Sequence, residues 1–212
     1  MSLKAMFDPK SGDTAVDTDR AVIVLELLDM SGSMSSNQQA VIDALARRRA
    51  ALQPSEDAPA LRMSMWTFNG QIGVLHDFQP LENVPVVDAQ MYHPDGMTAL
   101  YDTVREGFKA VKAFRDELRQ KGVSTKTVII VYTDGEDTAS RNATAADVAK
   151  EAADLLREEA TLVLFGFGID VKTIAAQMGF PEKNALSLNN NERDIRHAIE
   201  VRTPNLLKQA SS

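Results

Sequence analysis

The sequence predicts an α/β domain with a doubly wound, mostly parallel six-stranded sheet, one antiparallel edge strand and helices on both faces. Three almost continuous apolar runs, 22–28, 128–132 and 162–167, are typical of strands that are covered on both sides. They alternate with segments of helical periodicity, which indicates a sheet between two helical layers. The dipeptide Asn69-Gly70 is a strong hairpin signal and predicts the antiparallel edge.

The remaining elements follow in order along the chain. Ser35 or Ser36 can cap the first helix, and Pro204 is expected to break the last one. Further strands are expected at 61–68, 72–78 and 185–188. Helices are expected over 36–52, from the end of the loop 79–97 to about residue 118, over 144–158, over 171–178, and from Asn191 to about Arg202.

The chain of 212 residues fits one sizeable domain, which we expect to span 21–212 after a polar, flexible arm over 1–20. Cysteine is absent, which excludes disulfides and thiolate metal sites. The formal net charge of −7 argues against a broad surface for nucleic acid or anionic membranes. Because the sequence contains neither a membrane-spanning run nor an apolar secretion segment near its start, we expect a cytoplasmic protein.

Oxygen-bearing side chains gather where two buried strands end. The sequence Asp-Met-Ser-Gly-Ser follows the first strand at 29–33, and Thr-Asp-Gly-Glu-Asp ends another at 133–137. A third segment, Asp-Gly-Met-Thr at 95–98, leads into the long helix. In α/β sheets, ligands bind outside the carboxyl ends of strands where the winding reverses. Oxygen ligands without nitrogen or sulfur suit a hard cation, Mg²⁺ first and then Mn²⁺ or Ca²⁺.

The pattern Asp29-x-Ser31-x-Ser33, with Thr98 and Asp134 further along the chain, resembles the metal-ion-dependent adhesion site of von Willebrand factor A domains. The resemblance covers nearly the whole predicted domain and implies the Rossmann-like fold of that family. It implies that Ser31, Ser33 and Thr98 contact the metal through their hydroxyl groups. Asp29 and Asp134 would act mainly from outside, through water or by orienting the serines.

The resemblance also implies a function. Neutral hydroxyl ligands leave Mg²⁺ strongly electrophilic, and its octahedral preference leaves positions filled by water. A carboxylate of another protein can replace one water, so the site would be a socket for an Asp or Glu of a partner and not an enzyme active site. The segments Gly-Met-Thr-Ala-Leu-Tyr-Asp and Tyr-Thr-Asp-Gly-Glu-Asp are similar to those of intracellular bacterial members, which implies a partner such as an AAA+ ATPase or a stress-response component.

Two alternatives stay open. Ser31, Ser33 and Thr98 could each only cap a helix, and Asp134 could be an ordinary turn residue, which would leave a structural module with a vestigial site. A Mg²⁺-dependent phosphohydrolase of the haloacid dehalogenase type also places an Asp after its first strand. It needs a second Asp at the position of Ser31 to protonate the leaving group, and serine cannot do this near neutral pH.

Several polar residues outside this pattern have plainer interpretations. Glu26 interrupts a buried strand and therefore needs a partner or a place at the edge of the buried zone. Asp95, Glu136 and Asp137 could tune the metal, but they are interpreted as turn or surface acids. The three arginines at 47–49 are interpreted as a solvated helix face.

Overall fold

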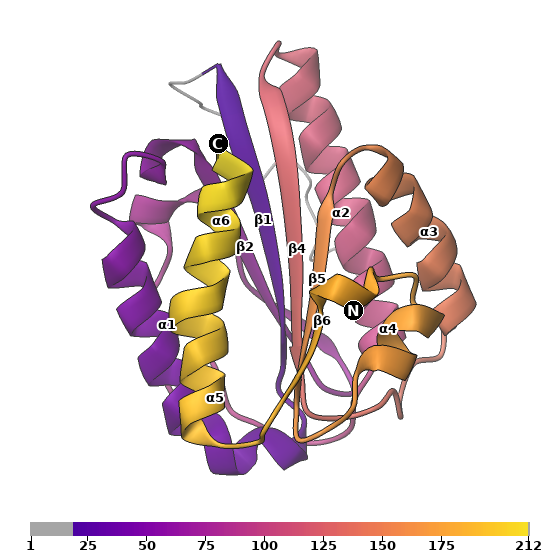
Figure 1. Ribbon diagram of the computed structural model, residues 1–212. Helices are drawn as coiled ribbons and strands as arrows, with labels where there is room; N and C mark the ends of the chain where they lie inside the picture. Colours follow the sequence, from indigo (N-terminus) through magenta and orange to yellow (C-terminus); the bar gives the residue numbers. More distant parts are fainter. Residues whose placement is uncertain (1–18, 212) are drawn as a thin grey trace.

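The computed structural model describes residues 19–211, which fold as a six-stranded sheet with helices on both faces (Figure 1). The strand order is β3-β2-β1-β4-β5-β6, in which β2 and β3 are antiparallel and all other neighbours are parallel. This confirms the predicted fold class and the hairpin at Asn69-Gly70. The strands are β1 (Arg20–Asp29), β2 (Leu61–Phe68), β3 (Ile72–Pro80), β4 (Ser124–Thr133), β5 (Thr161–Phe167) and β6 (Ala185–Leu188).

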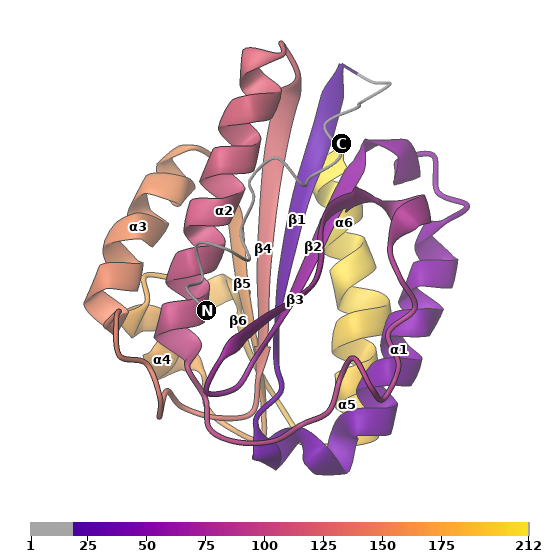
Figure 2. The ribbon, with the colours of Figure 1, turned by 180° about the vertical axis from the view of Figure 1, so that it is seen from behind.

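The helices divide between the two faces of the sheet (Figures 1 and 2). They are α1 (Gln38–Leu52), α2 (Leu100–Gln120), α3 (Ala145–Arg157), α4 (Lys172–Gln177), α5 (Glu192–Arg196), a π-helical segment (His197–Arg202) and α6 (Thr203–Ser211). Helices α1, α5 and α6 cover one face, and α2, α3 and α4 cover the other. No helix within residues 19–211 is long and apolar enough to cross a membrane. Of the predicted arm, 1–18 lies outside the described residues, and Arg20 already belongs to β1.

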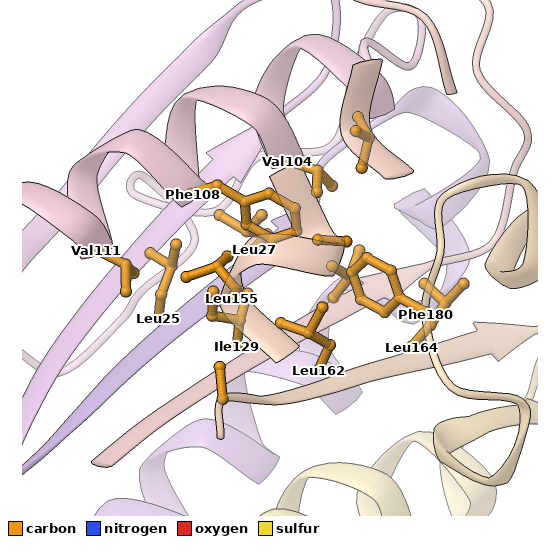
Figure 3. Packing of buried hydrophobic residues seen from close by; sticks show 14 of the residues in the cluster. Leu25, Leu27, Val104, Phe108, Val111, Ile129, Leu155, Leu162, Leu164 and Phe180 are labelled. Atoms are coloured by element: carbon orange, nitrogen blue, oxygen red, sulfur yellow. The ribbon is translucent and has the colours of Figure 1, made fainter. Parts of the chain in front are cut away.

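Alternate residues of β1 enter two separate apolar cores. Leu25 and Leu27 pack into the core beneath α2 and α3, where Figure 3 shows Leu27 close to the ring of Phe108 and Leu25 beside Val111. Val22 and Val24 point to the opposite face and pack into the core that includes residues of α1 and α6. Full burial of a Val or Leu side chain contributes about 1.5–3 kcal/mol. This cover on both faces is why β1 is an almost continuous apolar run in the sequence.

The winding of the sheet reverses between β1 and β4. From β1 the chain continues to β2 and β3 on one side, and β4, β5 and β6 follow on the other. Strands β1 and β4 are parallel neighbours, and the last pair of their register is Leu28 with Tyr132. Their carboxyl ends therefore meet at one edge of the sheet, at the lower end of the view in Figure 1.

The central arginine of the run at 47–49 is buried, so its interpretation as a solvated face is wrong. Arg48 forms a bidentate ion pair with Glu26, with Nη2 donating to Oε2 at 2.6 Å. The hydroxyl of Tyr132 donates to Glu26 Oε1 at 3.1 Å. Arg47, by contrast, is exposed and pairs with Glu200. A buried carboxylate requires such partners, which answers the question that Glu26 raised in the sequence.

Two expected helix boundaries are wrong. A 3-10 turn, Gly32–Asn37, separates β1 from α1, and the hydroxyl of Ser35 donates to the carbonyl of Gly32 instead of accepting from a helix amide. Pro204 does not end the last helix, because it occupies the first turn of α6 after the π-helical segment. The wider π turn suits a residue without an N–H, whose ring would clash in a regular α-helix.

Candidate metal centre

The first carboxylate of the predicted site is fully buried at the end of β1. Asp29 Oδ1 accepts a hydrogen bond from the Ser31 amide at 2.7 Å, and its Oδ2 accepts one from Thr133 Oγ1 at 2.5 Å. The hydroxyl of Tyr92 donates to the backbone carbonyl of Asp29 at 2.9 Å. These bonds hold the carboxylate at the junction of β1 and β4 and fold the chain so that Ser31 turns toward β4.

The two serines and Asp134 form a continuous hydrogen-bonded chain. Ser33 Oγ donates to Asp134 Oδ1 at 2.6 Å, and Ser31 Oγ lies 3.1 Å from Ser33 Oγ. A serine has one hydroxyl proton. Because Ser33 donates its proton to Asp134, its oxygen can only accept in the contact with Ser31, whose side chain also lowers the pKa of Asp29 by hydrogen bonding. Each hydroxyl oxygen thus keeps at least one lone pair for a cation.

Thr98 is brought to the same edge by backbone bonds to the loop that follows β4. Its carbonyl accepts from the amides of Thr138 and Ala139 at 2.8 and 3.0 Å, and its own amide donates to Thr138 Oγ1 at 3.0 Å. Thr98 as a whole residue is 5% exposed. Its hydroxyl lies 3.6 Å from the point where a Cβ on Gly135 would stand. Within residues 19–211 this hydroxyl makes no hydrogen bond, and its oxygen is not among the fully buried polar atoms that lack a partner.

The loops approach one another closely where glycines stand. The amide of Gly32 donates to the carbonyl of Gly96 at 3.1 Å, which joins the loop of the serines to the loop of Thr98. Gly96 has φ +78°, a left-handed conformation that suits glycine. The structure therefore brings all five predicted residues, Asp29, Ser31, Ser33, Thr98 and Asp134, to one edge of the sheet.

The electrostatics of this edge favour a cation. Burial raises the pKa of Asp29 above its ordinary value, and the nearby charge of Asp134 raises that pKa further. Burial also raises the pKa of Asp134, although hydrogen bonds from Ser33 and Asn190 act in the opposite direction. Hydrogen bonds offset only part of the cost of burying these two carboxylates. A positive charge near both of them would stabilise their ionised forms. Residues 19–211 contain no cluster of three or more His, Cys, Asp or Glu ligands.

Two of the three other acidic residues near the site, Asp95 and Asp137, accept hydrogen bonds from neighbouring residues. Asp137 Oδ1 accepts from the amide of Tyr101 at 3.2 Å and from Ser140 Oγ at 2.5 Å, which secures the first turn of α2. Asp95 accepts from the amide of Gly96 at 2.7 Å within its own loop. Glu136 is exposed. These contacts agree with the interpretation of Asp95 and Asp137 as turn residues.

Sequence reasoning missed four residues that contact the site. Thr133 and Tyr92 hydrogen-bond to Asp29, Asn190 lies near enough to Asp134 to lower the pKa of its carboxyl, and Asn37 donates to Asn190. Thr133 carried a weak signal, because it is a hydroxyl residue directly before Asp134 at the end of a buried strand. Tyr92, Asn37 and Asn190 carried none, since only the tertiary fold brings them to this edge.

Comparison with known proteins gives one family and several structures of similar fold. The model of the von Willebrand factor type A domain family matches residues 23–212. No curated protein matches the chain. Among solved structures, the vWF domain of the type V pilus tip protein Mfa5 from Porphyromonas gingivalis is similar, with a TM-score of 0.61 and 10% identity. That match covers 91% of this chain and 97% of the other.

Two of the similar structures contain a bound metal ion. Manganese-loaded TRAP protein from Plasmodium vivax has a TM-score of 0.56 and 19% identity over 84% of this chain and 72% of its own. Proximal thread matrix protein 1 from the mussel byssus, with a zinc-occupied MIDAS motif, has a TM-score of 0.58 and 15% identity over 93% and 47%. At these sequence identities, the structural similarity establishes a shared fold and nothing further. The chain spans about half the length of the mussel protein and 30% of a similar pilus adhesin, SpaC from Lactobacillus rhamnosus.

Proposed function

This chain belongs to the von Willebrand factor type A domain family, and from that premise we propose that it is a metal-dependent protein-interaction module. A divalent cation, Mg²⁺ first and Mn²⁺ or Ca²⁺ as substitutes, would be held by the hydroxyls of Ser31, Ser33 and Thr98. Asp29 and Asp134 would orient the ligands and balance the charge. The partner would contribute an Asp or Glu side chain.

One observation carries the proposal. Ser33 donates its hydroxyl proton to Asp134 and contacts the hydroxyl of Ser31, and the hydroxyl of Thr98, which makes no hydrogen bond within residues 19–211, is not sealed from solvent. The oxygens of these three hydroxyl groups can therefore accept a further interaction. A hard cation satisfies such oxygens, and the donor set of hydroxyls and carboxylates suits it.

In this proposal the hydroxyl groups bind the cation, and the two carboxylates orient the serines that carry them. Asp29 receives the Ser31 amide and the Thr133 hydroxyl, which fixes the turn that presents both serines. Asp134 receives the Ser33 proton. When bound, the cation supplies an electrophilic centre that a carboxylate oxygen can contact. Because the protein carries a formal net charge of −7, recognition of an acidic partner residue depends on this local centre and not on long-range attraction.

The proposal excludes catalysis as the main role. A phosphohydrolase of the kind considered above needs a proton donor beside Asp29, and Ser31 occupies that position. The placement of the protein in a bacterial cytoplasm, with an AAA+ ATPase or a stress-response component as partner, is part of the proposal and is supported by the two sequence motifs alone.

The proposal is tested by two binding measurements. Isothermal titration with MgCl₂ and MnCl₂ should show one site. A peptide array with Asp or Glu at one position should then bind the protein in Mg²⁺, while the matched Asn and Gln array and an EDTA control should not. Absence of metal binding would favour a vestigial site, and array binding that survives EDTA would remove the metal from the mechanism. Turnover of an aryl phosphate that is lost in Asp29→Asn would instead support an enzyme.

A further inference from the structure

Asn69, the first residue after β2, hydrogen-bonds to both ends of the loop that carries Thr98. We propose that Asn69 is a positioning residue of the candidate metal centre, which holds Thr98 at the site from the hairpin between β2 and β3. This inference rests on the proposed function, and it adds the carboxyl end of a third strand to the elements that build the site.

The polar groups of Asn69 form hydrogen bonds in two pairs. One pair closes the hairpin turn: the amide of Asn69 donates to the carbonyl of Gln71 at 3.0 Å, and its Oδ1 accepts from the amide of Gln71 at 2.9 Å. The other pair holds the loop 95–99: Nδ2 donates to the carbonyl of Asp95 at 2.9 Å, and the carbonyl of Asn69 accepts from the amide of Ala99 at 2.7 Å. These partners fix the orientation of the side-chain amide, because a backbone carbonyl only accepts and a backbone N–H only donates.

The loop before Thr98 has little packing of its own to keep it in place. Asp95, Gly96 and Met97 are exposed, and Met97 has 56% of its surface open to solvent. None of these three residues lies in a helix or a strand. Because a segment with few buried contacts opens at a low cost in free energy, hydrogen bonds to neighbouring elements are needed to fix its position.

The peptide group that joins Thr98 to Ala99 is held from two sides. Its carbonyl, which belongs to Thr98, accepts from the amides of Thr138 and Ala139 in the loop after β4 at 2.8 and 3.0 Å. Its N–H, which belongs to Ala99, donates to the carbonyl of Asn69 at the end of β2. Because both polar groups of one planar peptide are fixed, the direction in which the backbone presents the Thr98 side chain is restricted.

The strand register explains why the end of β2 reaches the site. Phe68 pairs with Asp29 in the parallel register of β1 and β2, and the amide of Met30 donates to the carbonyl of Phe68 at 2.7 Å. The carbonyl of Met30 in turn accepts from the amide of Asp95 at 2.9 Å. Backbone hydrogen bonds thus join the end of β2 to the end of β1 and to the loop of Thr98. Asn69 adds a side-chain bond to this set, which a substitution can remove.

The test compares Asn69→Ala with Gln71→Ala, a matched control in the same turn. Gln71 is exposed, and its side chain makes no hydrogen bond within residues 19–211, whereas its backbone takes part in the turn. Isothermal titration with MgCl₂ and MnCl₂ should show about a 3- to 10-fold loss of affinity in Asn69→Ala, the size expected from one hydrogen bond between uncharged groups. Gln71→Ala should bind both metals as the wild type does.

Hydrogen exchange of the metal-free proteins separates a positioning role from a role in the turn alone. In Asn69→Ala, exchange of the amides of Asp95 and Ala99 should increase relative to Gln71→Ala, because the side-chain bond to their loop is lost. An increase confined to the paired strands of the hairpin, 65–68 and 72–76, would show that Asn69 only closes the turn and would overturn the proposal.

The remaining outcomes are also distinct. Wild-type metal affinity in an Asn69→Ala protein that a thermal melt shows to be folded would overturn the proposal. If Asn69→Ala does not fold, Asn69→Ser replaces it, because a serine hydroxyl can still accept from the amide two residues on, while its shorter side chain lacks the nitrogen that donates to Asp95. The same loss of affinity and the same exchange pattern are expected. If the wild type binds neither metal, the proposed function fails, and the hold of Asn69 on the loop is judged by the exchange over 95–99 alone.

Discussion

Replacement of Ser33 by alanine tests the hydrogen-bonded chain at its centre. Ser33→Ala removes the proton that Asp134 accepts at 2.6 Å and the oxygen that contacts Ser31 at 3.1 Å. Ser33 itself is exposed, so the change creates no cavity in either core. Its effect should therefore appear at the metal and only weakly in the fold.

The magnitude follows from the bond that is lost. A hydrogen bond to a charged group contributes about 1.5–3 kcal/mol. A difference of 1.4 kcal/mol corresponds to about tenfold in an equilibrium constant, so the affinity for Mg²⁺ should fall about 10- to 100-fold. In the metal-free protein, water can replace part of the lost bond, and a loss of about 1 kcal/mol should lower the melting temperature by about 2–4 °C.

The assay is isothermal titration of MgCl₂ into wild type, Ser33→Ala and Ser36→Ala. Ser36 is the matched control, since it lies in the same 3-10 turn, is exposed, and its hydroxyl has no partner within residues 19–211. Ser36→Ala should bind Mg²⁺ with wild-type affinity. Equal affinities for the two serine variants would refute the reasoning, because the chain through Ser33 would then have no bearing on the metal.

Three further predictions concern the fold and its charges. Arg48→Ala should lower the free energy of unfolding in urea by about 3–5 kcal/mol, because it leaves the buried Glu26 without its ion-pair partner. Arg47→Ala, at an exposed ion pair, should lower it by less than about 1 kcal/mol. Similar losses in the two variants would contradict this prediction. Gly166→Ala places a Cβ 2.0 Å from the buried Val171 Cγ1 and should cost about 1–3 kcal/mol, and an unchanged melting temperature would count against the packing described here. Because burial raises the folded-state pKa of Asp29 above the ordinary 3.8, its protonation stabilises the metal-free fold below that value, and the stabilisation is lost as pH rises through the raised pKa. Metal-free wild type should thus lose stability with rising pH more steeply than Asp29→Asn, and parallel pH profiles would exclude this contribution.

The fold was largely predictable because its strands obey simple rules. The buried strands appear in the sequence as apolar runs, since helices cover both of their faces, and Asn69-Gly70 marks the hairpin by its turn chemistry. Helix ends were less predictable. Nothing local distinguishes a cap by Ser35 from a 3-10 turn, and a proline normally breaks a helix unless a wider turn precedes it, as it does before Pro204.

The five residues of the candidate site were also identifiable, because each stands where an element begins or ends and its side chain bears oxygen. Their supporting contacts were not. Asn190 lies far from Asp134 in sequence, and only the order of β5 and β6 brings its loop to the site. Arg48 was misjudged for the same reason, since its partner Glu26 lies on a strand and the sequence alone does not show which helix covers it.

The most direct test is the position of a bound cation. Crystals of the protein grown with MnCl₂ should give a single strong anomalous peak at the carboxyl ends of β1 and β4, in direct contact with the hydroxyl oxygens of Ser31, Ser33 and Thr98. A protein that binds Mn²⁺ in solution but shows its anomalous peak away from these three oxygens would contradict the account.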